Sequence, residues 1–470
     1  MSRSTSDSST PDLDRWARLA VEAPRYTSYP TAAELSPSFG PADAERVLVV
    51  AAARPSAPVS IYVHLPFCRE MCWFCGCHAL VARTADRIDR YLDALERETD
   101  RVAARLGNRR DVAELHFGGG SPSLLTPAQF ERLWSSLSGR LRIRAETEAS
   151  IEVDPRTVDP ARMAAYRGAG IQRVSMGFQD LDAGVQAAIG RNQSAATSVR
   201  AYEWARAAGF GGVNIDLCYG LPEQTEQSFE DTVREVARLR PDRLALFGYA
   251  HVPAMKPLQA RIDTATLPDA ARRVRLFTAG RNLLLAAGYR AIGIDHFALP
   301  GDPLVRALDA GRLHRNFQGY TTSTTDTLVG LGLSAISDFG DAVVQNQRTL
   351  PGYLAAVDSG ALATERGFVR SADDRVRGEI IRQLMCTFAV DVPDIERRFG
   401  VAFARDFAPE LAELARLADD GLLTIAPERL DLSPLGKMLA RNVATVFDAY
   451  RRRQGSAVEP HARRRFSLTV

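Results

Sequence analysis

Short apolar runs alternate with longer amphipathic stretches from residue 60 to about residue 297. Runs that are rich in β-branched residues and nearly continuous in apolar residues are typical of buried parallel strands. They predict strands over 60–66, 112–118, 148–154, 172–178, 212–219, 243–250 and 290–297. The amphipathic stretches between them predict helices over 85–106, 126–141, 194–209, 225–240 and 269–287.

Repeated strand–helix units require right-handed crossovers and therefore a parallel sheet. This pattern leaves two arrangements open, a closed eight-unit barrel and an open doubly wound sheet. About six regular units favour an incomplete barrel. In either arrangement the chemistry collects just past the carboxyl ends of the strands. Glu152, Asp154, Gln179 and Asp216 lie at or near such ends, so we expect the functional site at that face.

The pattern changes after about residue 365. Helices are predicted over 374–388, 392–399, 407–419 and 434–452, with a short β-like stretch at 420–425. Helices followed by a small β-wing predict a winged-helix-like module. Its stretch 407–419 contains a single basic residue, Arg416, and so lacks the basic stripe of a helix that reads DNA. A packing or lid role is the favoured interpretation.

The chain is therefore expected to have three parts. Residues 1–45 form a tail and a substrate-proximal segment, residues 46–365 the catalytic barrel, and residues 366–470 the helical C-terminal domain. Residues 1–14 are rich in Ser, Thr and Asp and predict a frayed tail. Pro24 and Pro30 bracket aromatic and hydroxyl residues, and this stretch is either a linker or a segment that folds back over a site.

Charge and composition narrow the class of protein. The 470 residues include 59 Lys and Arg against 57 Asp and Glu, for a net charge of +2. This balance gives no reason to expect binding to nucleic acid or to an anionic membrane. No apolar run approaches the roughly 18 residues of a membrane span, and the start, MSRSTSDSSTPDLD, does not have the pattern of a signal peptide. We expect a cytoplasmic protein.

The cysteines carry the most specific signal. Cys68, Cys72, Cys75 and Cys77 follow the first predicted strand with the spacing C-x3-C-x2-C-x-C. Zinc sites usually combine two separated cysteine pairs or add distant histidines, and no second pair follows. Three closely spaced thiolates in a loop suit an iron–sulfur cluster. Zinc and unligated redox thiols remain open, and the spacing does not say which three cysteines bind metal.

A C-x3-C-x2-C loop after the first strand of a strand–helix chain resembles the radical S-adenosylmethionine (SAM) superfamily. The wider chain resembles the oxygen-independent coproporphyrinogen III oxidase family over about residues 20–450. The matching motifs, in chain order, are RYTSYPT (25–31), YVHLPFC (62–68), CGC (75–77), GGGSP (118–122), IEVDP (151–155), SMGFQ (175–179), NID (214–216), YGLP (219–222), YAH (249–251), DHF (295–297) and HRNFQGYTT (314–322).

The resemblance implies an incomplete (β/α)6-type barrel of the TIM-like class, a small C-terminal domain and an N-terminal segment near the substrate. It implies the conversion of two propionate side chains of coproporphyrinogen III to vinyl groups, giving protoporphyrinogen IX in porphyrin and haem biosynthesis. The implied oxidant of the C–H bond is a 5′-deoxyadenosyl radical made from SAM at a [4Fe–4S] cluster. An unidentified reductant and an unidentified electron acceptor complete the reaction, and we expect a monomer.

The same resemblance implies roles for individual residues. Cys68, Cys72 and Cys75 are expected to ligate the cluster, while Cys77 is needed for activity in an uncertain role. A first SAM is expected at Tyr62, Gly119 and Glu152. A second SAM is expected at Phe74, Gly120, Ser121, Gln179, Arg191, Asp216, Ala250 and Ile336. Substrate contacts are expected from Arg25, Tyr26, Tyr29, Arg315 and Tyr320.

Two other functions would fit parts of this pattern. A haem-binding chaperone-like paralogue would keep the radical SAM core without oxidase activity, but that group usually lacks Cys77, the segment 25–30 and the motif 314–322. A zinc-containing regulator that binds nucleic acid would need a second metal-binding pair and a basic recognition helix. The motifs favour the oxidase.

Overall fold

A curved twelve-stranded sheet forms the body of the protein. The computed structural model describes residues 16, 19, 21–54, 56–455 and 469. Six parallel strands make the core of the sheet, and they lie side by side in chain order: β1 (Val59–Leu65), β4 (Val112–Gly119), β5 (Glu148–Val153), β6 (Arg173–Gln179), β7 (Gly212–Tyr219) and β8 (Arg243–Gly248). Each lies within two residues of a predicted strand, so the strand–helix pattern is confirmed here.

The sheet continues beyond this core on both sides. On the β1 side follow β13 (Leu328–Leu331), β14 (Ile336–Asp338), β15 (Ala342–Asn346) and β16 (Thr364–Val369). On the β8 side follow β10 (His296–Ala298) and β9 (Arg290–Ile292). The strands β16 and β9 are the two ends of the sheet and do not pair with each other. The barrel is therefore open, which confirms the expected incomplete barrel of about six units.

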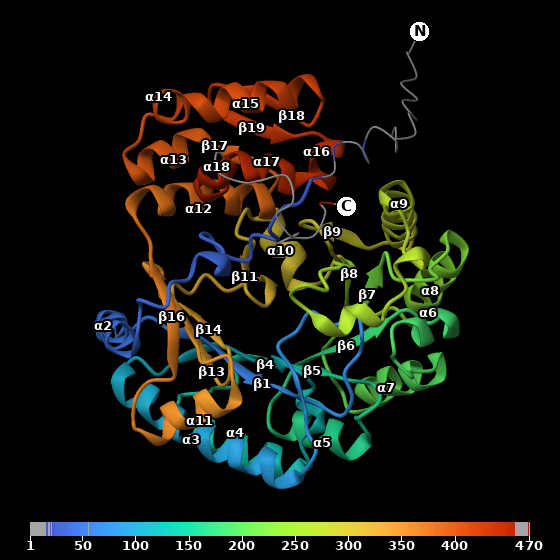
Figure 1. Cartoon of the computed structure of the whole chain (residues 1–470), viewed down its shortest axis with the longest axis vertical. Helices are drawn as coiled ribbons and strands as arrows, with labels where there is room; N and C mark the ends of the chain where they lie inside the picture. The colour runs from blue at the N-terminus through green and yellow to red at the C-terminus, as the bar shows by residue number, and fades with distance from the viewer. Residues whose placement is uncertain (1–15, 17–18, 20, 55, 456–468, 470) are drawn as a thin grey trace.

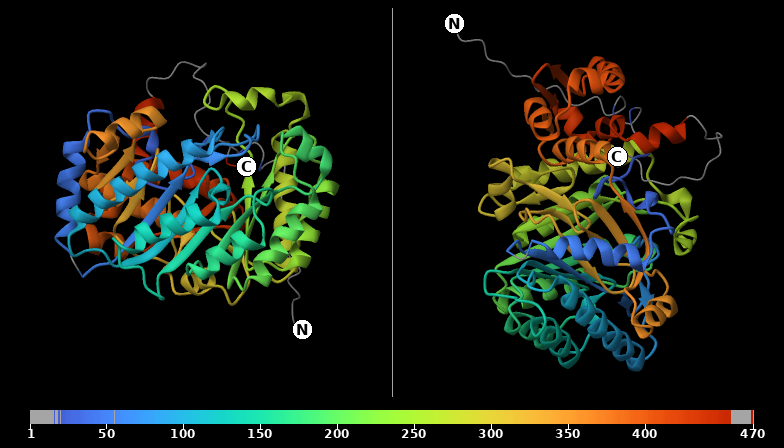
Figure 2. Two further views of the ribbon diagram at one scale, coloured as in Figure 1. Left: turned by 90° about the horizontal axis from the view of Figure 1, so that it is seen from below. Right: turned by 90° about the vertical axis from the view of Figure 1, so that its left-hand side faces the viewer.

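Helices cover the outer face of the sheet (Figures 1 and 2). They are α2 (Pro41–Ala52), α3 (Ala85–Leu106), α4 (Pro127–Ser138), α5 (Pro160–Gly168), α6 (Ala183–Ala188), α7 (Ala195–Ala207), α8 (Glu226–Leu239), α9 (Ala270–Ala286), α10 (Pro303–Asp309) and α11 (Leu350–Asp358). Short 3-10 helices cover Ala32–Glu34, Pro122–Leu124, Pro257–Arg261 and Thr264–Thr266. Helix α3 has the predicted bounds because its apolar positions recur with helical spacing. None of the described helices is long and apolar enough to cross a membrane.

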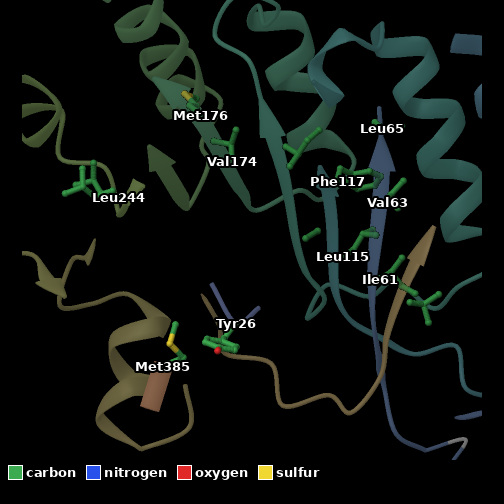
Figure 3. Close-up of a cluster of buried hydrophobic side chains, with 14 of the residues drawn as sticks. Tyr26, Ile61, Val63, Leu65, Leu115, Phe117, Val174, Met176, Leu244 and Met385 are labelled. Carbon is green, nitrogen blue, oxygen red and sulfur yellow. The ribbon is translucent and has the colours of Figure 1, made fainter. Parts of the chain in front are cut away.

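The two faces of the parallel strands differ in chemistry. Figure 3 shows Ile61, Val63 and Leu65 of β1 beside Leu115 and Phe117 of β4, and all five belong to the main buried apolar cluster. The intervening residues point to the other face, because successive side chains of a strand alternate. On β4, β5 and β6 those residues are mainly polar, and the burial pattern of β5 and β6 alternates along the strand. The strands are thus less continuously buried than their apolar content predicts.

One predicted strand is wrong in its extent. The stretch 290–297 forms two short antiparallel strands, β9 and β10, instead of a single strand. Gly293 between them has φ +56°, and a Cβ there would lie 1.9 Å from the Tyr320 ring. A close approach of this kind at a left-handed position favours glycine. The chain therefore turns at Gly293 and leaves the parallel direction.

The C-terminal module is a separate layer of helices with a three-stranded sheet (Figure 1). It comprises α12 (Ala372–Cys386), β17 (Ala389–Asp391), α13 (Val392–Phe399), α14 (Phe403–Asp406), α15 (Ala408–Asp419), β18 (Leu423–Ala426), β19 (Arg429–Leu432), α16 (Pro434–Met438), α17 (Ala440–Val446) and α18 (Ala449–Gly455). Three helices replace the single one predicted over 434–452. The breaks fall at Leu439, whose φ and ψ are −107° and 27°, and at Asp448, whose carboxylate accepts from the N–H groups of Tyr450 and Arg451.

The segment before α2 folds back onto the barrel and the C-terminal module. Tyr26 and Tyr29 are each 5% exposed. The Tyr26 hydroxyl donates to Asp448 at 2.9 Å, and the Tyr29 hydroxyl accepts from the Ala449 N–H at 3.0 Å. Of the two readings of this segment, the linker is wrong and the fold-back is confirmed. The predicted tail over 1–14 lies outside the described residues.

The expected domain limits cross two elements. The limit at 45 falls inside α2, and the limit at 365 falls inside β16, which stays paired with β15 as far as Val369. Helix α12 then begins at Ala372. We propose limits at about residue 40 and between residues 369 and 372.

A buried carboxylate ties α3 to the edge of the barrel. Glu98 is 4% exposed and accepts from the Gly332 N–H, the Tyr353 hydroxyl and the Asn346 amide at 2.6–2.8 Å. Burial outweighs these hydrogen bonds and raises the pKa of Glu98 to about 7. The folded protein therefore holds this proton at pH values where the unfolded chain has released it.

Glu98 should make the protein more stable in mild acid. Its raised pKa adds stability that is present below the ordinary carboxyl pKa and is lost as the pH rises toward 7. Between pH 5 and pH 8 we expect this group to lower the free energy of unfolding by about 2 to 3 kcal/mol. Urea unfolding at several pH values should show this slope in the parent and in the exposed control Glu146→Gln, and not in Glu98→Gln. A Glu98→Gln protein that keeps the full slope would contradict the assignment.

Candidate functional site

The four clustered cysteines lie in the loop that follows β1. This loop contains the short strands β2 (Phe67–Cys68) and β3 (Leu80–Val81), which pair in parallel. All four cysteines line one cavity of about 860 Å³ inside the barrel. Cys72 is buried, Cys68 and Cys75 are half-buried, and Cys77 is exposed. A single loop thus places four sulfur donors on the wall of the cavity.

Cys72 lies against two arginines. Arg191 Nη1 is 3.3 Å and Arg156 Nη2 is 3.5 Å from the Cys72 Sγ. Both guanidiniums also pair with Asp154, at 3.5 and 2.7 Å. Burial would raise the pKa of Asp154, but the hydrogen bond from Arg156 and the charge of Arg191 lower it below the ordinary value. Two cationic donors at one sulfur favour a negatively charged sulfur ligand.

The other three thiols differ in their surroundings. Ser121 Oγ lies 3.7 Å from the Cys68 Sγ, and burial raises the pKa of Cys68 to about 12. The Cys77 N–H donates to the Cys75 Sγ at 3.4 Å. Hydrogen bonding from Cys77 lowers the pKa of Cys75 to about 6, whereas the bond to Cys75 raises that of Cys77. Cys75 is therefore the thiolate of this pair and Cys77 the thiol.

These residues fit an iron–sulfur cluster. Cys68, Cys72 and Cys75 present sulfur donors to the same cavity, and the arginines beside Cys72 can compensate the charge of an anionic cluster. Among the described residues, no three His, Cys, Asp or Glu side chains lie close enough together to hold one metal ion. A cubane differs from a single ion in that each thiolate binds its own iron.

The glycine run at the end of β4, Gly118 to Gly120, packs against His64 of β1 and against the cysteine loop. Gly119 has φ +115°, and a Cβ there would lie 2.7 Å from Cε1 of His64. A Cβ on Gly120 would lie 2.8 Å from the Phe67 carbonyl oxygen. The N–H groups of Gly120 and Ser121 donate to backbone carbonyls of Leu65 and Phe67 at 2.8 Å. The close approach that requires glycine here is to the protein's own loop.

Glu152 is held by a network of polar side chains from three strands. Its carboxylate accepts from the Gly119 N–H at 3.1 Å and from His116 Nε2 at 3.2 Å. The other ring nitrogen of His116 lies 2.7 Å from Ser150 Oγ, and Tyr62 stacks on the His116 ring at 5.9 Å. Burial would raise the pKa of Glu152, but the contact with His116 lowers it. Glu152 is therefore ionised and can accept hydrogen bonds from a cationic ligand group.

Tyr62 also connects this network to the cysteine loop. Its hydroxyl lies 2.9 Å from Nδ1 of His64, whose Nε2 lies 2.9 Å from the His78 carbonyl oxygen. Only an N–H can bond that carbonyl, so Nε2 carries the proton and Nδ1 accepts from Tyr62. Burial lowers the pKa of His64 to about 4. His64 is therefore a neutral structural residue, and it keeps the strand end and the loop together.

A second group of expected residues lines the same cavity. It consists of Phe74, Gly120, Ser121, Gln179, Arg191, Asp216 and Ala250. Asp216 accepts from the Asn214 amide at 2.7 Å and from the Ser175 hydroxyl at 3.2 Å. Burial and the nearby charge of Glu152 raise the pKa of Asp216 to about 6. A cationic ligand group beside Asp216 would favour its ionised form and lower its pKa again.

The sequence did not identify several residues that shape this region. His116, Ser175 and Asn214 bind the expected carboxylates Glu152 and Asp216 from the inner faces of β4, β6 and β7, and Ser150 of β5 bonds to His116. Gln259 donates to the carbonyl oxygens of Phe74 and Ala250 at 3.0 and 3.1 Å. The signal was present, because polar residues at every second position of a strand share a face.

Some expected residues lie outside the cavity lining. Ile336 lies on β14, and Tyr62 touches the site through His116. Tyr26 and Tyr29 bond to the C-terminal module instead.

The other three residues expected to contact the substrate differ in whether their polar groups reach the cavity. Arg25 lines the cavity, donates to the Gly248 carbonyl oxygen at 2.9 Å and lies over the Phe247 ring. Tyr320 also lines it, but its hydroxyl donates to Met385 O. Arg315 is 4% exposed and stacks on Tyr320. Of these, Arg25 is the cation that reaches the cavity.

Comparison with known proteins agrees with this arrangement. Residues 62–236 match the family model of the radical SAM superfamily, and residues 371–439 match that of the HemN C-terminal domain. The oxygen-independent coproporphyrinogen III oxidases of Salmonella typhimurium and Escherichia coli are each 43% identical to this chain over 94% of its length and 96% of theirs. That of Pseudomonas aeruginosa is 41% identical over 93% and 96%.

The chain belongs to this family of oxidases. The solved structure of coproporphyrinogen III oxidase (HemN) from Escherichia coli, described as a radical SAM enzyme, is 42% identical and covers 90% of this chain and 97% of its own, with a TM-score of 0.87. The resemblance inferred from the motifs is therefore confirmed, and so is the expectation of an oxidoreductase. Membership of the radical SAM superfamily implies a 4Fe–4S cluster and SAM.

Replacement of Gly119 should disturb the site through the His64 ring. We expect Gly119→Ala to lower the free energy of unfolding by at least about 2 kcal/mol, because its φ is strained and the His64 ring is held by hydrogen bonds on both nitrogens. Gly209→Ala is the matched control, since Gly209 has φ +80° with nothing within 4 Å of the added Cβ, and it should lose about 1 kcal/mol. Equal losses in urea unfolding would contradict the steric explanation.

Proposed function

We propose that this chain converts coproporphyrinogen III to protoporphyrinogen IX without oxygen, by oxidative decarboxylation of two propionate side chains to vinyl groups. One observation carries the proposal. The four-cysteine loop opens into the same 860 Å³ cavity as Glu152, Asp216 and Arg25. A cluster, a cationic cofactor and an anionic substrate therefore have matching groups in one enclosed space. The relatives named for this activity support the assignment.

Cys68, Cys72 and Cys75 are proposed as the three ligands of the [4Fe–4S] cluster. Cys77 is proposed as a thiol next to it that is not a ligand. This division is supported by the exposed position of Cys77 and by the hydrogen bond that its N–H donates to Cys75. Arg156 and Arg191 donate to Cys72 and so stabilise its thiolate.

Two SAM molecules are proposed to share the cavity. Glu152 would accept hydrogen bonds from the amino group of the first, beside Gly119 and Tyr62. Arg191 would bind the carboxylate and Asp216 the ammonium or ribose of the second, among Phe74, Gly120, Ser121, Gln179 and Ala250. Ile336 stays in this proposal through the family resemblance alone, because it lies outside the cavity lining.

The cofactors, once bound, supply a carbon-centred radical that can remove a hydrogen atom from an unactivated C–H bond, which no protein side chain can do. The chain's own residues bind, orient and enclose. The strands form the wall of the cavity, and Arg25, which lines it and pairs with Asp295, would offer a positive charge to a substrate carboxylate. Loss of each carboxylate as CO2 leaves one further electron to be taken up. A separate reductant for the cluster and a separate electron acceptor are proposed partners of unknown identity.

The remaining expectations are also proposals. The protein is proposed to act as a monomer in the cytoplasm, and its six cysteines, all free, are compatible with a reducing compartment. The C-terminal module is proposed to pack on the barrel rather than bind nucleic acid. In α15 its acidic residue Glu410 pairs with Arg377 and Arg452 inside the module.

Anaerobic turnover tests the main proposal. Protein reconstituted with iron and sulfide should show the brown absorbance of a [4Fe–4S] cluster. With SAM, a reductant and cell extract, it should convert coproporphyrinogen III to protoporphyrinogen IX. Chromatography of the oxidised porphyrins measures this conversion. No conversion together with tight haem binding would instead favour the haem-binding chaperone paralogue.

Single cysteine variants test the ligand set. Cys68→Ala, Cys72→Ala and Cys75→Ala should each lose most of the bound iron and the cluster absorbance, because a thiolate corner is missing. Cys77→Ala should keep both and lose turnover. Cys386→Ala is the matched control, since Cys386 is buried on α12 and does not line the cavity, and it should keep cluster and turnover. A Cys68→Ala protein with a full cluster would refute the ligand assignment.

A further inference from the structure

The cavity extends to the amino ends of the strands, opposite the cysteine loop. Its lining there includes Ser60, Glu114, Glu148, Arg173 and Arg243, each at or near the start of its strand. The segment that contains β11 (His314–Asn316) and β12 (Gly319–Thr321) lies across this end, and residues 316–318 and 320–322 also line the cavity. We call this set of residues the floor.

The acidic half of the floor already has partners. Glu114 accepts from the Ser60 hydroxyl at 3.0 Å and from the Thr321 hydroxyl. Glu148 accepts from the Thr322 hydroxyl at 3.3 Å. The floor segment thus bonds to the carboxylates on the β4 and β5 side.

The basic half has unused donors. The Arg173 side chain pairs with Glu148 at 3.6 Å and with Asp302 at 3.7 Å, and within the described part of the chain its guanidinium makes no hydrogen bond. Arg243 donates from Nε to Asp302 at 2.8 Å, but its Nη2 is buried without a hydrogen-bond partner. Buried donors that have no hydrogen-bond partner are costly and rare in folded proteins. Burial and the charge of Arg243 also lower the pKa of Arg173, although both arginines share Asp302 as a partner.

The geometry points to a carboxylate subsite at Arg173 and Arg243, and we propose that it holds a propionate of the substrate that is not converted. This proposal rests on the proposed function. Guanidinium groups bind carboxylates through paired, charge-assisted hydrogen bonds. Both arginines line the same cavity as the cysteines, so one molecule can reach both ends.

The spacing suits such a substrate. Arg173 precedes Gly177 by four residues on β6, and Gly177 lies in register with Asp216. Four residues of a strand span about 13 Å. This is comparable with the distance across a tetrapyrrole from a side chain on one rim to a carboxylate on the opposite rim. The substrate has four propionates and two are converted, so anchoring an unconverted one at the floor would select which propionate faces the reacting end.

The test compares Arg173→Gln with Arg290→Gln. Arg290 also begins a strand, but it is 47% exposed and pairs with Asp309 on the surface. For Arg173→Gln we expect the KM for coproporphyrinogen III to rise about ten- to hundredfold, as for the loss of one charge-assisted hydrogen bond. Equilibrium dialysis should show unchanged SAM binding, and more of the once-decarboxylated intermediate should be released. Arg173→Lys should recover part of the loss, and Arg290→Gln should match the parent.

A binding measurement makes the result independent of turnover. Fluorescence titration with coproporphyrin III, the stable oxidised tetracarboxylate, should show weaker binding to Arg173→Gln. Its tetramethyl ester should bind parent and variant equally. Unchanged KM and unchanged coproporphyrin binding in Arg173→Gln would overturn the subsite. Weaker SAM binding with an unchanged KM would overturn its assignment to the substrate. Failure of the proposed function differs from both, because the parent and Arg290→Gln would then also lack turnover.

Discussion

The alternation of apolar and polar side chains along the parallel strands is the constraint on which the site depends. In β4 to β7 the outward residues join the buried cluster beneath the helices, while the inward residues are mostly polar or glycine. A closed barrel of this kind would fill its interior with apolar layers. Here the sheet stays open between β16 and β9, and the inner face surrounds a cavity with a cysteine loop at one end and arginines at the other.

The positions of the six core strands and of α3 followed from the sequence, because periodicity reports which face of each element is buried. The breaks at Gly293, Leu439 and Asp448 did not follow. Two of them depend on a partner distant in sequence or on a local cap: Gly293 meets the Tyr320 ring, and Asp448 caps α18 and binds Tyr26. Propensity within a short window carries no information about such contacts.

The site shows the same division. The spacing of Cys68, Cys72 and Cys75 and the ordered motifs pointed to the chemistry, and most of the expected residues meet at one cavity. The supporting residues were missed, because His116 and Gln259 belong to no motif and are recognised only by what they bond. Tyr26 and Tyr29 show that residues of a shared motif can also dock a segment, since their hydroxyls bond to Asp448 and Ala449, while their expected contact with the substrate stays a prediction.

Hydrogen bonds between the segment 21–30 and the C-terminal module constrain the order in which the protein assembles. Ala23 and Glu22 accept from Arg441 and Arg451, in addition to the bonds of Tyr26 and Tyr29 to Asp448 and Ala449. A ribosome releases the N-terminal part first, so residues 21–30 gain these partners only after residues 441–451 have emerged, whereas Arg25 can meet Gly248 and Asp295 earlier. The part of the cavity wall that contains Arg25 is therefore held from two sides, by the barrel and by the part of the chain that is made last.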